Sequence, residues 1–127
     1  MEFTQSIKKN TQLGYVYNKG KSMANRLLVL YAVKNKKALE ENRLGITVSK
    51  KVGKSVVRSR VTRLIKESYR LNESRIRPGY WLVVIARVQA KDASYHEMEK
   101  ALCHLLRKQG LLREEKKTVQ AAKGEEG

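Results

Sequence analysis

Apolar residues recur along this chain with two different spacings, which predicts a mixture of strands and helices. Short runs rich in β-branched and aromatic residues, typical of strands, occupy 26–33, 43–49 and 80–88. Apolar residues at helical spacing, typical of amphipathic helices, occur at 11–19, at 55–71 and from residue 94 onward. The run 80–88 is almost continuously apolar, so we expect it at the centre of a sheet.

The ends of these elements carry capping and turn residues. Asn10 or Thr11 is expected to cap the first helix and Ser55 the second. Ser94 begins the last helix with Glu97 three residues later, which is the pattern of a capping box. Helix ends and turns are further indicated at Gly20, Pro78-Gly79 and Gly110.

The element order predicts a single-domain α+β sandwich, in which helices pack on a small mixed sheet. The 127 residues, 41% of them hydrophobic, suffice for one modest core, which we assign to residues 1–112. The polar stretch 34–42 is expected to form a hairpin-like connection between the first two strands. Residues 113–127 carry four basic and four acidic side chains, so a disordered tail is expected there.

Charge adds a functional expectation to this fold. The chain has 28 Lys and Arg against 12 Asp and Glu, a formal net charge of +16. Residues 43–70 hold nine of the basic residues and one acid, Glu67, which amounts to half of the net charge. Such a concentration of like charge is costly unless a polyanion neutralises it. A nucleic acid is therefore the expected partner.

The predicted helix 55–71 buries one side and presents cations on the other. Its core-facing stripe is formed by Val57, Val61, Leu64, Ile65 and Ser68. Arg58 and Arg60 flank this stripe, so their alkyl stems can follow the core edge while the guanidinium groups reach outward. The other cations on or just before the helix are Lys50, Lys51, Lys54, Arg63, Lys66 and Arg70. Together with the positive end of the helix dipole, they predict a phosphate-binding surface.

Aromatic side chains offer a second kind of contact with RNA. An exposed ring of Tyr15, Tyr17 or Tyr31 could stack an unpaired base, although ordinary core packing is the alternative for each. Tyr31 falls on the opposite strand face from Leu28 and Leu30. Trp81, at the start of the most apolar strand, is expected in the core.

The sequence indicates binding, without catalytic side chains of its own. It contains no recognisable nucleophile motif and no phosphate-binding loop. His96, His104 and Cys103 lack the spacing of a zinc site, so no metal ligand is assigned. A lone cysteine forms no intrachain disulfide and fits a reducing, cytoplasmic setting. No apolar run reaches the length of a spanning helix, and no membrane partner is expected.

Composition leaves two other binding functions open. A ribosomal or ribosome-assembly RNA-binding protein would be equally basic. A DNA-binding protein could place the basic helix in a major groove, but strands precede this helix where a helix-turn-helix protein has a second helix. The RNA that co-purifies with the chain would separate these alternatives.

Motifs in several segments resemble those of one family, the bacterial ribonuclease P protein component. Its signature is close to Ser-Lys-Lys-x-Gly-Asn-x-Val-x-Arg-Asn-Arg-x-x-Arg-x-x-Arg/Lys-Glu, and residues 49–67 read SKKVGKSVVRSRVTRLIKE. Residues 8–22 resemble the family's first helix and loop, 24–31 its first strand and 83–87 its late strand. The resemblance spans roughly residues 7–112.

The resemblance implies the protein subunit of a ribonucleoprotein that removes the 5′ leader of precursor tRNA by endonucleolytic cleavage. A catalytic RNA with bound magnesium would perform the hydrolysis, and no further protein partner is implied. Contacts with this RNA are implied for Lys51, Lys54, Arg58, Arg60, Arg63 and Lys66. Contacts with the leader are implied for Leu13, Tyr17 and Tyr31, with Ser49 and Lys50 nearby. The family fold also implies a left-handed βαβ crossover.

Three positions depart from the family pattern. Lys54 and Ser59 stand where the signature has asparagine, so hydrogen bonds made by those amides are not carried over. Leu13 stands where the family usually has phenylalanine, and leucine packs against a base without stacking on it. Tyr17 and Tyr31 are therefore expected to carry more of the leader contact.

Overall fold

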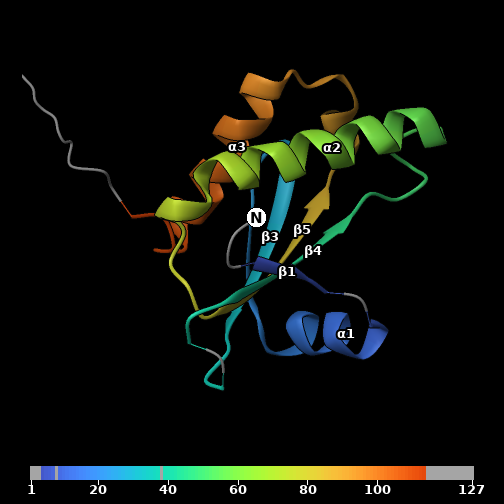
Figure 1. Ribbon diagram of the computed structural model, residues 1–127. Coiled ribbons are helices and arrows are strands. Elements are labelled where there is room, and N and C mark those ends of the chain that lie inside the picture. The colour runs from blue at the N-terminus through green and yellow to red at the C-terminus, as the bar shows by residue number, and fades with distance from the viewer. Residues whose placement is uncertain (1–3, 8, 38, 114–127) are drawn as a thin grey trace, which may run out of the picture.

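The computed structural model describes residues 4–7, 9–37 and 39–113, and the predicted tail lies almost wholly outside these residues. Five strands and three α-helices follow one another along the described chain (Figure 1). They are β1 (Thr4–Ser6), α1 (Asn10–Lys19), β2 (Lys21–Ala24), β3 (Leu28–Lys34), β4 (Asn42–Thr47), α2 (Ser55–Asn72), β5 (Tyr80–Ala86) and α3 (Tyr95–Lys108). Short 3-10 turns occupy Glu73–Arg75 and Val88–Asp92. The α+β class is confirmed.

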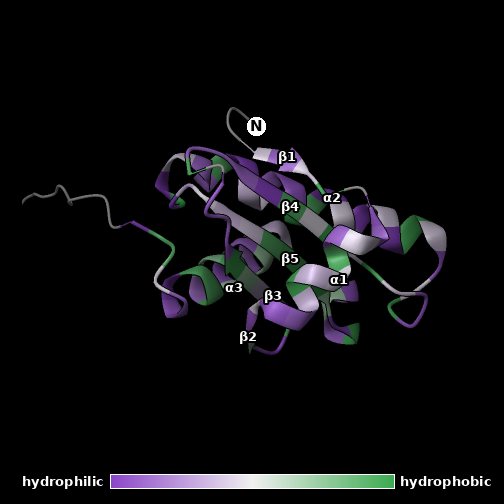
Figure 2. Ribbon diagram, turned by 90° about the horizontal axis from the view of Figure 1, so that it is seen from below, coloured by the Kyte–Doolittle hydropathy of each residue, from purple (hydrophilic) through white to green (hydrophobic). Residues whose placement is uncertain are grey.

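The strands form one mixed sheet in the order β1-β4-β5-β3-β2, which can be followed in Figure 2. Strand β5 is central, as predicted, and pairs antiparallel with β3 and parallel with β4. The hairpin-like connection predicted for residues 34–42 is wrong, because β5 lies between β3 and β4. Helix α2 instead connects the parallel strands β4 and β5. The hand of this crossover stays a prediction from the family resemblance.

Both strands that the sequence did not predict, β1 and β2, lie at the edges of the sheet. Strand β1 has the sequence TQS and β2 the sequence KSMA, too short and too polar to show an alternating pattern. Strand β1 pairs parallel with β4, and β2 pairs antiparallel with β3. Edge pairing thus depends on the tertiary context and not on local propensity.

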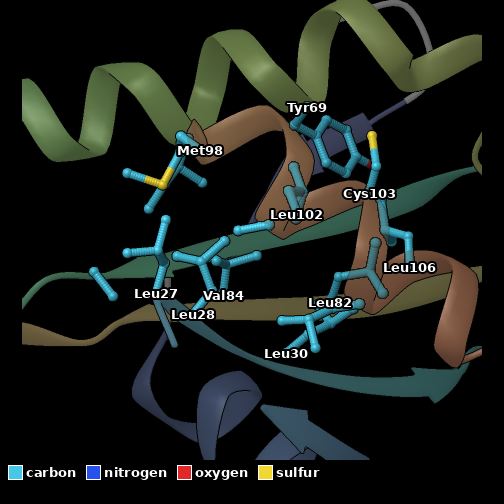
Figure 3. Close-up of a cluster of buried hydrophobic side chains, with 14 of the residues drawn as sticks. Leu27, Leu28, Leu30, Tyr69, Leu82, Val84, Met98, Leu102, Cys103 and Leu106 are labelled. Atoms are coloured by element: carbon cyan, nitrogen blue, oxygen red, sulfur yellow. The ribbon is translucent and has the colours of Figure 1, made fainter. Parts of the chain in front are cut away.

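Helices cover both faces of the sheet: α2 and α3 lie on one side and α1 on the other (Figure 1). The larger core fills the space between the sheet and α2 and α3 (Figure 3). Leu28, Leu82 and Val84 contribute to it from the sheet, and Met98 and Leu102 from α3. The predicted apolar stripe of the last helix, Met98, Ala101, Leu102, Leu105 and Leu106, is buried here.

A smaller core joins α1 to the opposite face. Ile7, Val16 and Val83 are its buried members, and Leu13 and Tyr31 are among the partly buried side chains packed against them. Val16 is completely buried, whereas the neighbouring Tyr15 and Tyr17 are exposed. Helix α1 therefore packs on the sheet through a narrow apolar stripe, and the side chains on either side of that stripe remain accessible to solvent.

The capping box is confirmed, but two other predicted caps are wrong. The Glu97 N–H donates to Ser94 Oγ at 3.1 Å, and the Ser94 N–H donates to Glu97 Oε1 at 2.9 Å. Lys9 precedes the first helix in place of Asn10 or Thr11, and Lys54 precedes the second in place of Ser55. Both have extended backbone, and neither helix has a side-chain cap. Gly110 follows α3 with φ of +74°, where glycine avoids the strain of a side chain.

Candidate nucleic-acid interface

Helix α2 carries its basic residues on the side that faces away from the core. Val61, Ile65 and Ser68 are buried, and Val57 and Leu64 pack partly buried against the larger core, which confirms the predicted stripe. The side chains of Lys54, Arg63 and Lys66 are exposed, as is Lys51 in the preceding loop. These four positive charges are therefore available to a ligand.

The two remaining predicted RNA contacts, Arg58 and Arg60, are half-buried and bonded to the backbone. Arg58 Nε donates to the Gly53 carbonyl oxygen at 3.1 Å. Arg60 uses both terminal nitrogens: Nη2 donates to Ala93 O at 2.7 Å and Nη1 to Lys91 O at 3.3 Å. Arg60 thereby ties α2 to the segment that enters α3, so part of its role is structural. The sequence suggested no such role.

A groove of about 500 Å³ runs between α2 and the end of β4. Ile46 and Val48 line its β4 side. The α2 side is lined by Ser55, Arg58, Ser59, Thr62, Arg63 and Lys66. Cations and hydroxyl groups thus face an apolar wall, and the lining contains no acid. Such a surface suits the phosphates and sugars of a nucleic acid backbone.

Glu67, the only acid of the basic segment, is paired within α2. Its Oε2 lies 2.6 Å from Arg70 Nη2 at the surface. The hydrogen bond from Arg70 lowers the pKa of Glu67, so both groups are charged at neutral pH. Among the described residues, Arg63 and Lys66 have no acidic partner of this kind. The cationic groove is therefore not neutralised by its own helix.

Tyr17 and Tyr31 form an aromatic pair between α1 and the sheet. Their ring centroids are 5.1 Å apart with an interplanar angle of 75°, an edge-to-face contact. Tyr17 is 37% exposed. Tyr31 is half-buried on the α1 side of the sheet, opposite the face of Leu28 and Leu30, as predicted. Leu13 packs partly buried against the same small core.

The other two residues of the predicted leader site lie in the loop between β4 and α2. Ser49 and Lys50 are both exposed there. The loop is held by buried Val52, whose N–H donates to Ser49 O at 3.0 Å. A Cβ at Gly53 would lie 2.9 Å from Val57 Cγ1, so only glycine lets the loop approach α2 this closely. The structure thus groups Leu13, Tyr17 and Tyr31 on α1 and β3, and places Ser49 and Lys50 beyond the end of β4.

A second aromatic contact lies on the other flank of α1, where Trp81 is half-buried and packs against the smaller core. Tyr15 meets its ring edge-to-face at 5.6 Å, and the Arg43 guanidinium carbon is 5.5 Å from the ring centroid. The sequence did not reveal this cluster, because its three residues come from α1, β4 and β5. The one signal in the sequence is the alternation of β4, which places Arg43 on the face of the sheet opposite to that of Leu44.

The remaining titratable side chains give no indication of a catalytic centre in the described residues. Burial raises the pKa of the Cys103 thiol, which keeps it protonated and poorly nucleophilic. Within the same residues no three His, Cys, Asp or Glu side chains converge to hold a metal ion. In the described part of the chain, none of the helices has the length and apolar character needed to cross a bilayer.

Comparison with known sequences identifies the family. The model of the family described as Ribonuclease P matches residues 1–110. The ribonuclease P protein component of Alkaliphilus metalliredigens is 55% identical over 112 residues, which cover 88% of this chain and 99% of that protein. The one from Clostridium novyi is 52% identical over 111 residues, covering 87% and 98% respectively. The ribosomal alternative gains no support from these relatives.

Solved structures agree with the sequence relatives. The Staphylococcus aureus RNase P protein superposes with a TM-score of 0.78 at 38% identity, covering 85% of this chain and 97% of that one. The Thermotoga maritima RNase P protein gives a TM-score of 0.74 at 27% identity, covering 82% and 96%. The chain therefore belongs to the family of ribonuclease P protein components, the protein part of a ribonucleoprotein endoribonuclease.

Proposed function

We propose that this chain binds two RNAs at once, the catalytic RNA of ribonuclease P and the 5′ leader of precursor tRNA. The observation that carries the proposal is the placement of two RNA-compatible surfaces on opposite sides of one sheet (Figure 1). Helix α2 offers a cationic groove on one side, and Tyr17 with Tyr31 offers an aromatic pair on the other. Surfaces placed in this way do not compete for the same RNA segment.

The cationic groove is the proposed contact with the catalytic RNA. Exposed Arg63 and Lys66, with Lys51 and Lys54 at the start of α2, would neutralise backbone phosphates and release counterions. Arg58 contributes the part of its guanidinium that is not bonded to Gly53. Ser59 and Lys54, which replace the family's asparagines, both lie exposed at this surface. A hydroxyl group and an ammonium group would here take the place of two amides.

The aromatic pair is the proposed contact with the leader. Tyr17 presents an exposed ring that the edge-to-face contact with Tyr31 holds in place. Stacking of one unpaired base on such a ring contributes about 1–3 kcal/mol. Leu13 would add apolar contact, and Ser49 and Lys50 would meet the strand beyond β4. Mature tRNA has no leader, so this contact would favour substrate over product.

Catalysis in this proposal belongs to the RNA subunit. Magnesium bound mainly by that RNA would activate water and neutralise charge at the cleaved phosphate. The described residues of the chain offer no cluster of three metal-binding side chains. Its own contribution is to position the leader and to reduce phosphate repulsion during assembly. The product would be mature tRNA with a 5′ phosphate, formed in the cytoplasm.

A reconstitution assay tests this function. The chain is combined with a bacterial ribonuclease P RNA and precursor tRNA at low magnesium. We expect mature 5′ ends to form faster than with the RNA alone, because the added cations replace part of the magnesium that screens phosphate repulsion. An unchanged rate would contradict the proposal, and co-purification with ribosomal particles alone would favour the ribosomal alternative.

Two tyrosine variants test the leader contact separately. Tyr17→Ala and Tyr31→Ala should each weaken holoenzyme binding of precursor tRNA by about 1–3 kcal/mol and leave binding of mature tRNA unchanged. Tyr17→Phe is the matched control, because it keeps the ring and should keep the discrimination. Equal losses for precursor and mature tRNA would remove the leader assignment.

A further inference from the structure

Helix α1 has a second aromatic flank that the proposed leader site does not use. Tyr15 and Tyr17 stand on either side of the completely buried Val16. Tyr17 meets Tyr31, whereas Tyr15 meets Trp81. In the sheet, Tyr31 pairs with Val83 and Val33 with Trp81, so the two ring contacts occupy successive positions on the same face. The Tyr15–Trp81 flank is therefore the counterpart of the Tyr17–Tyr31 pair across α1.

The Tyr15–Trp81 flank opens into a pocket of about 690 Å³. The pocket is lined by Thr11, Gln12 and Tyr15 from α1, by Trp81, and by residues 33–37 at the end of β3. Tyr15 is 45% exposed, so its ring is accessible to a ligand. Lys34, Lys36 and Lys37 lie exposed beside it. A ring for a base and ammonium groups for phosphates are the features that bind unpaired nucleotides.

A second, adjoining pocket extends this surface. It measures about 400 Å³ and is lined by Gln5, Ser6, Lys9, Gln12 and Arg43. Gln12 lines both pockets, and Arg43 reaches from the second pocket to the Trp81 ring of the first. Five of the residues lining the two pockets are basic and none is acidic. The result is a continuous cationic track along one flank of α1.

We propose that this track binds the part of the 5′ leader that lies farther from the cleavage site. The inference rests on the proposed function, in which the nearer leader nucleotides occupy the Tyr17–Tyr31 pair. A helix is about 10–12 Å wide with its side chains, so a strand that leaves one flank of α1 reaches the other within a few nucleotides. Stacking on the exposed Tyr15 ring needs an unpaired base, so the track accepts a single strand and not a duplex.

Trp81 gives a direct test, because it is the only tryptophan of the chain. The full chain is titrated with an unstructured single-stranded RNA while tryptophan emission is followed. Binding should change the emission of wild type and of Tyr17→Ala. Tyr15→Ala should weaken the transition by about five- to 150-fold, the equivalent of one stacked base, and Tyr15→Phe should restore it. RNA binding that leaves Trp81 emission unchanged would overturn the site, whatever the outcome for the Tyr17–Tyr31 pair.

Leader length distinguishes the two sites in the holoenzyme. Two precursors are compared, one with a short leader that ends at the Tyr17–Tyr31 pair and one with a long leader. Tyr15→Ala and the double variant Lys36→Gln/Lys37→Gln should weaken only the long-leader precursor. The charge-matched control is the double variant Lys100→Gln/Lys108→Gln, which removes two exposed charges from α3. Tyr17→Ala should weaken both precursors. The assignment would be overturned if Tyr15→Ala affected both precursors equally, affected neither, or impaired assembly with the catalytic RNA. The result for Tyr17→Ala tests the proposed function separately, because this residue belongs to the Tyr17–Tyr31 pair.

Discussion

Arg60 donates a hydrogen bond of 2.7 Å from Nη2 to the carbonyl oxygen of Ala93, and this bond joins the basic helix to the segment that enters α3. A second bond, from Nη1 to Lys91 O at 3.3 Å, uses the other terminal nitrogen. Arg63 lies one turn further along α2 and is exposed without such bonds. Two arginines of the same helix surface therefore have different roles, which separate stability from RNA binding.

We expect Arg60→Ala to lower the free energy of unfolding by about 1–3 kcal/mol, because the partly buried carbonyl group of Ala93 and the exposed one of Lys91 lose a charged donor. Arg60→Lys keeps the charge but not the two-pronged geometry, so most of that loss should remain. Arg63→Ala is the matched exposed control and should stay within about 0.5 kcal/mol of wild type. Urea unfolding measures all three, and equal stability of Arg60→Ala and Arg63→Ala would contradict the assignment.

Arg63→Ala should instead alter RNA binding. Loss of one phosphate contact should reduce the slope of log K against log salt by about one, measured by titrating the catalytic RNA at several salt concentrations. Lys108→Gln removes an exposed charge on α3 and is expected to leave the slope unchanged. A slope that does not respond to Arg63→Ala would remove this residue from the interface.

The two departures from the family signature predict opposite effects. Ser59→Asn adds the amide of the family pattern at an exposed groove position and should strengthen catalytic-RNA binding by about 0.5–1.5 kcal/mol, the contribution of one hydrogen bond. Lys54→Asn removes a cation and should flatten the salt slope by about one. Weaker binding by Ser59→Asn would show that serine is fitted to the partner of this chain.

Acid should weaken the start of α3. The hydrogen bond from the Ser94 N–H holds the pKa of Glu97 below its ordinary value of 4.5. Because the lowered pKa belongs to the folded state, this contribution is present above about pH 4.5 and is lost as the pH falls through the folded-state pKa. Glu97→Gln should remove that part of the acid dependence in thermal unfolding. An acid profile identical to that of wild type would contradict this role.

The same capping box can be tested at neutral pH through its other partner. Ser94→Ala removes the acceptor for the Glu97 N–H and should lower the free energy of unfolding by about 1 kcal/mol. Ser55→Ala is the matched control at the start of α2, where no side-chain cap is present, and should have a smaller effect.

Asn42 should be among the most sensitive polar positions of the domain. It is completely buried; its Nδ2 donates to Arg77 O at 3.1 Å, and its Oδ1 accepts from the Tyr80 N–H at 2.8 Å. Asn42→Ala leaves these groups without partners and should cost about 3 kcal/mol in urea unfolding. Asn35→Ala is the control, since Asn35 accepts one bond from the Lys37 N–H at an exposed site.

The sequence correctly predicted those elements whose pattern of apolar or capping residues is contained within a short segment. The apolar run of β5, the stripe of α2 and the capping box of Ser94 and Glu97 each lie within a few turns or one strand, and each is confirmed. The N-caps of α1 and α2 were misplaced by one or two residues, because the cap position is defined by extended backbone and Lys9 and Lys54 adopt it. Side-chain preference alone does not fix that boundary.

The missing features depend on partners distant in sequence. Strand order could not be predicted, because β4 pairs with β5 across the whole length of α2. Arg60 was expected to face RNA, yet its acceptors at Lys91 and Ala93 are 31 and 33 residues away. Trp81 was expected in the core, and only the register with Arg43 and the position of Tyr15 show it at the edge of a pocket.

The alternation along β5 has a consequence for how this protein can vary. Val83 and Val84 are adjacent and completely buried, but Val83 belongs to the core beneath α1 and Val84 to the core beneath α2 and α3. Two residues joined by one peptide bond thus support the two proposed RNA surfaces, Val83 beneath α1 and Val84 beneath α2 and α3. We therefore expect a substitution at either valine to disturb mainly the packing of the helix on its own side of the sheet. The residues that support one RNA surface can therefore change in evolution without changing those that support the other.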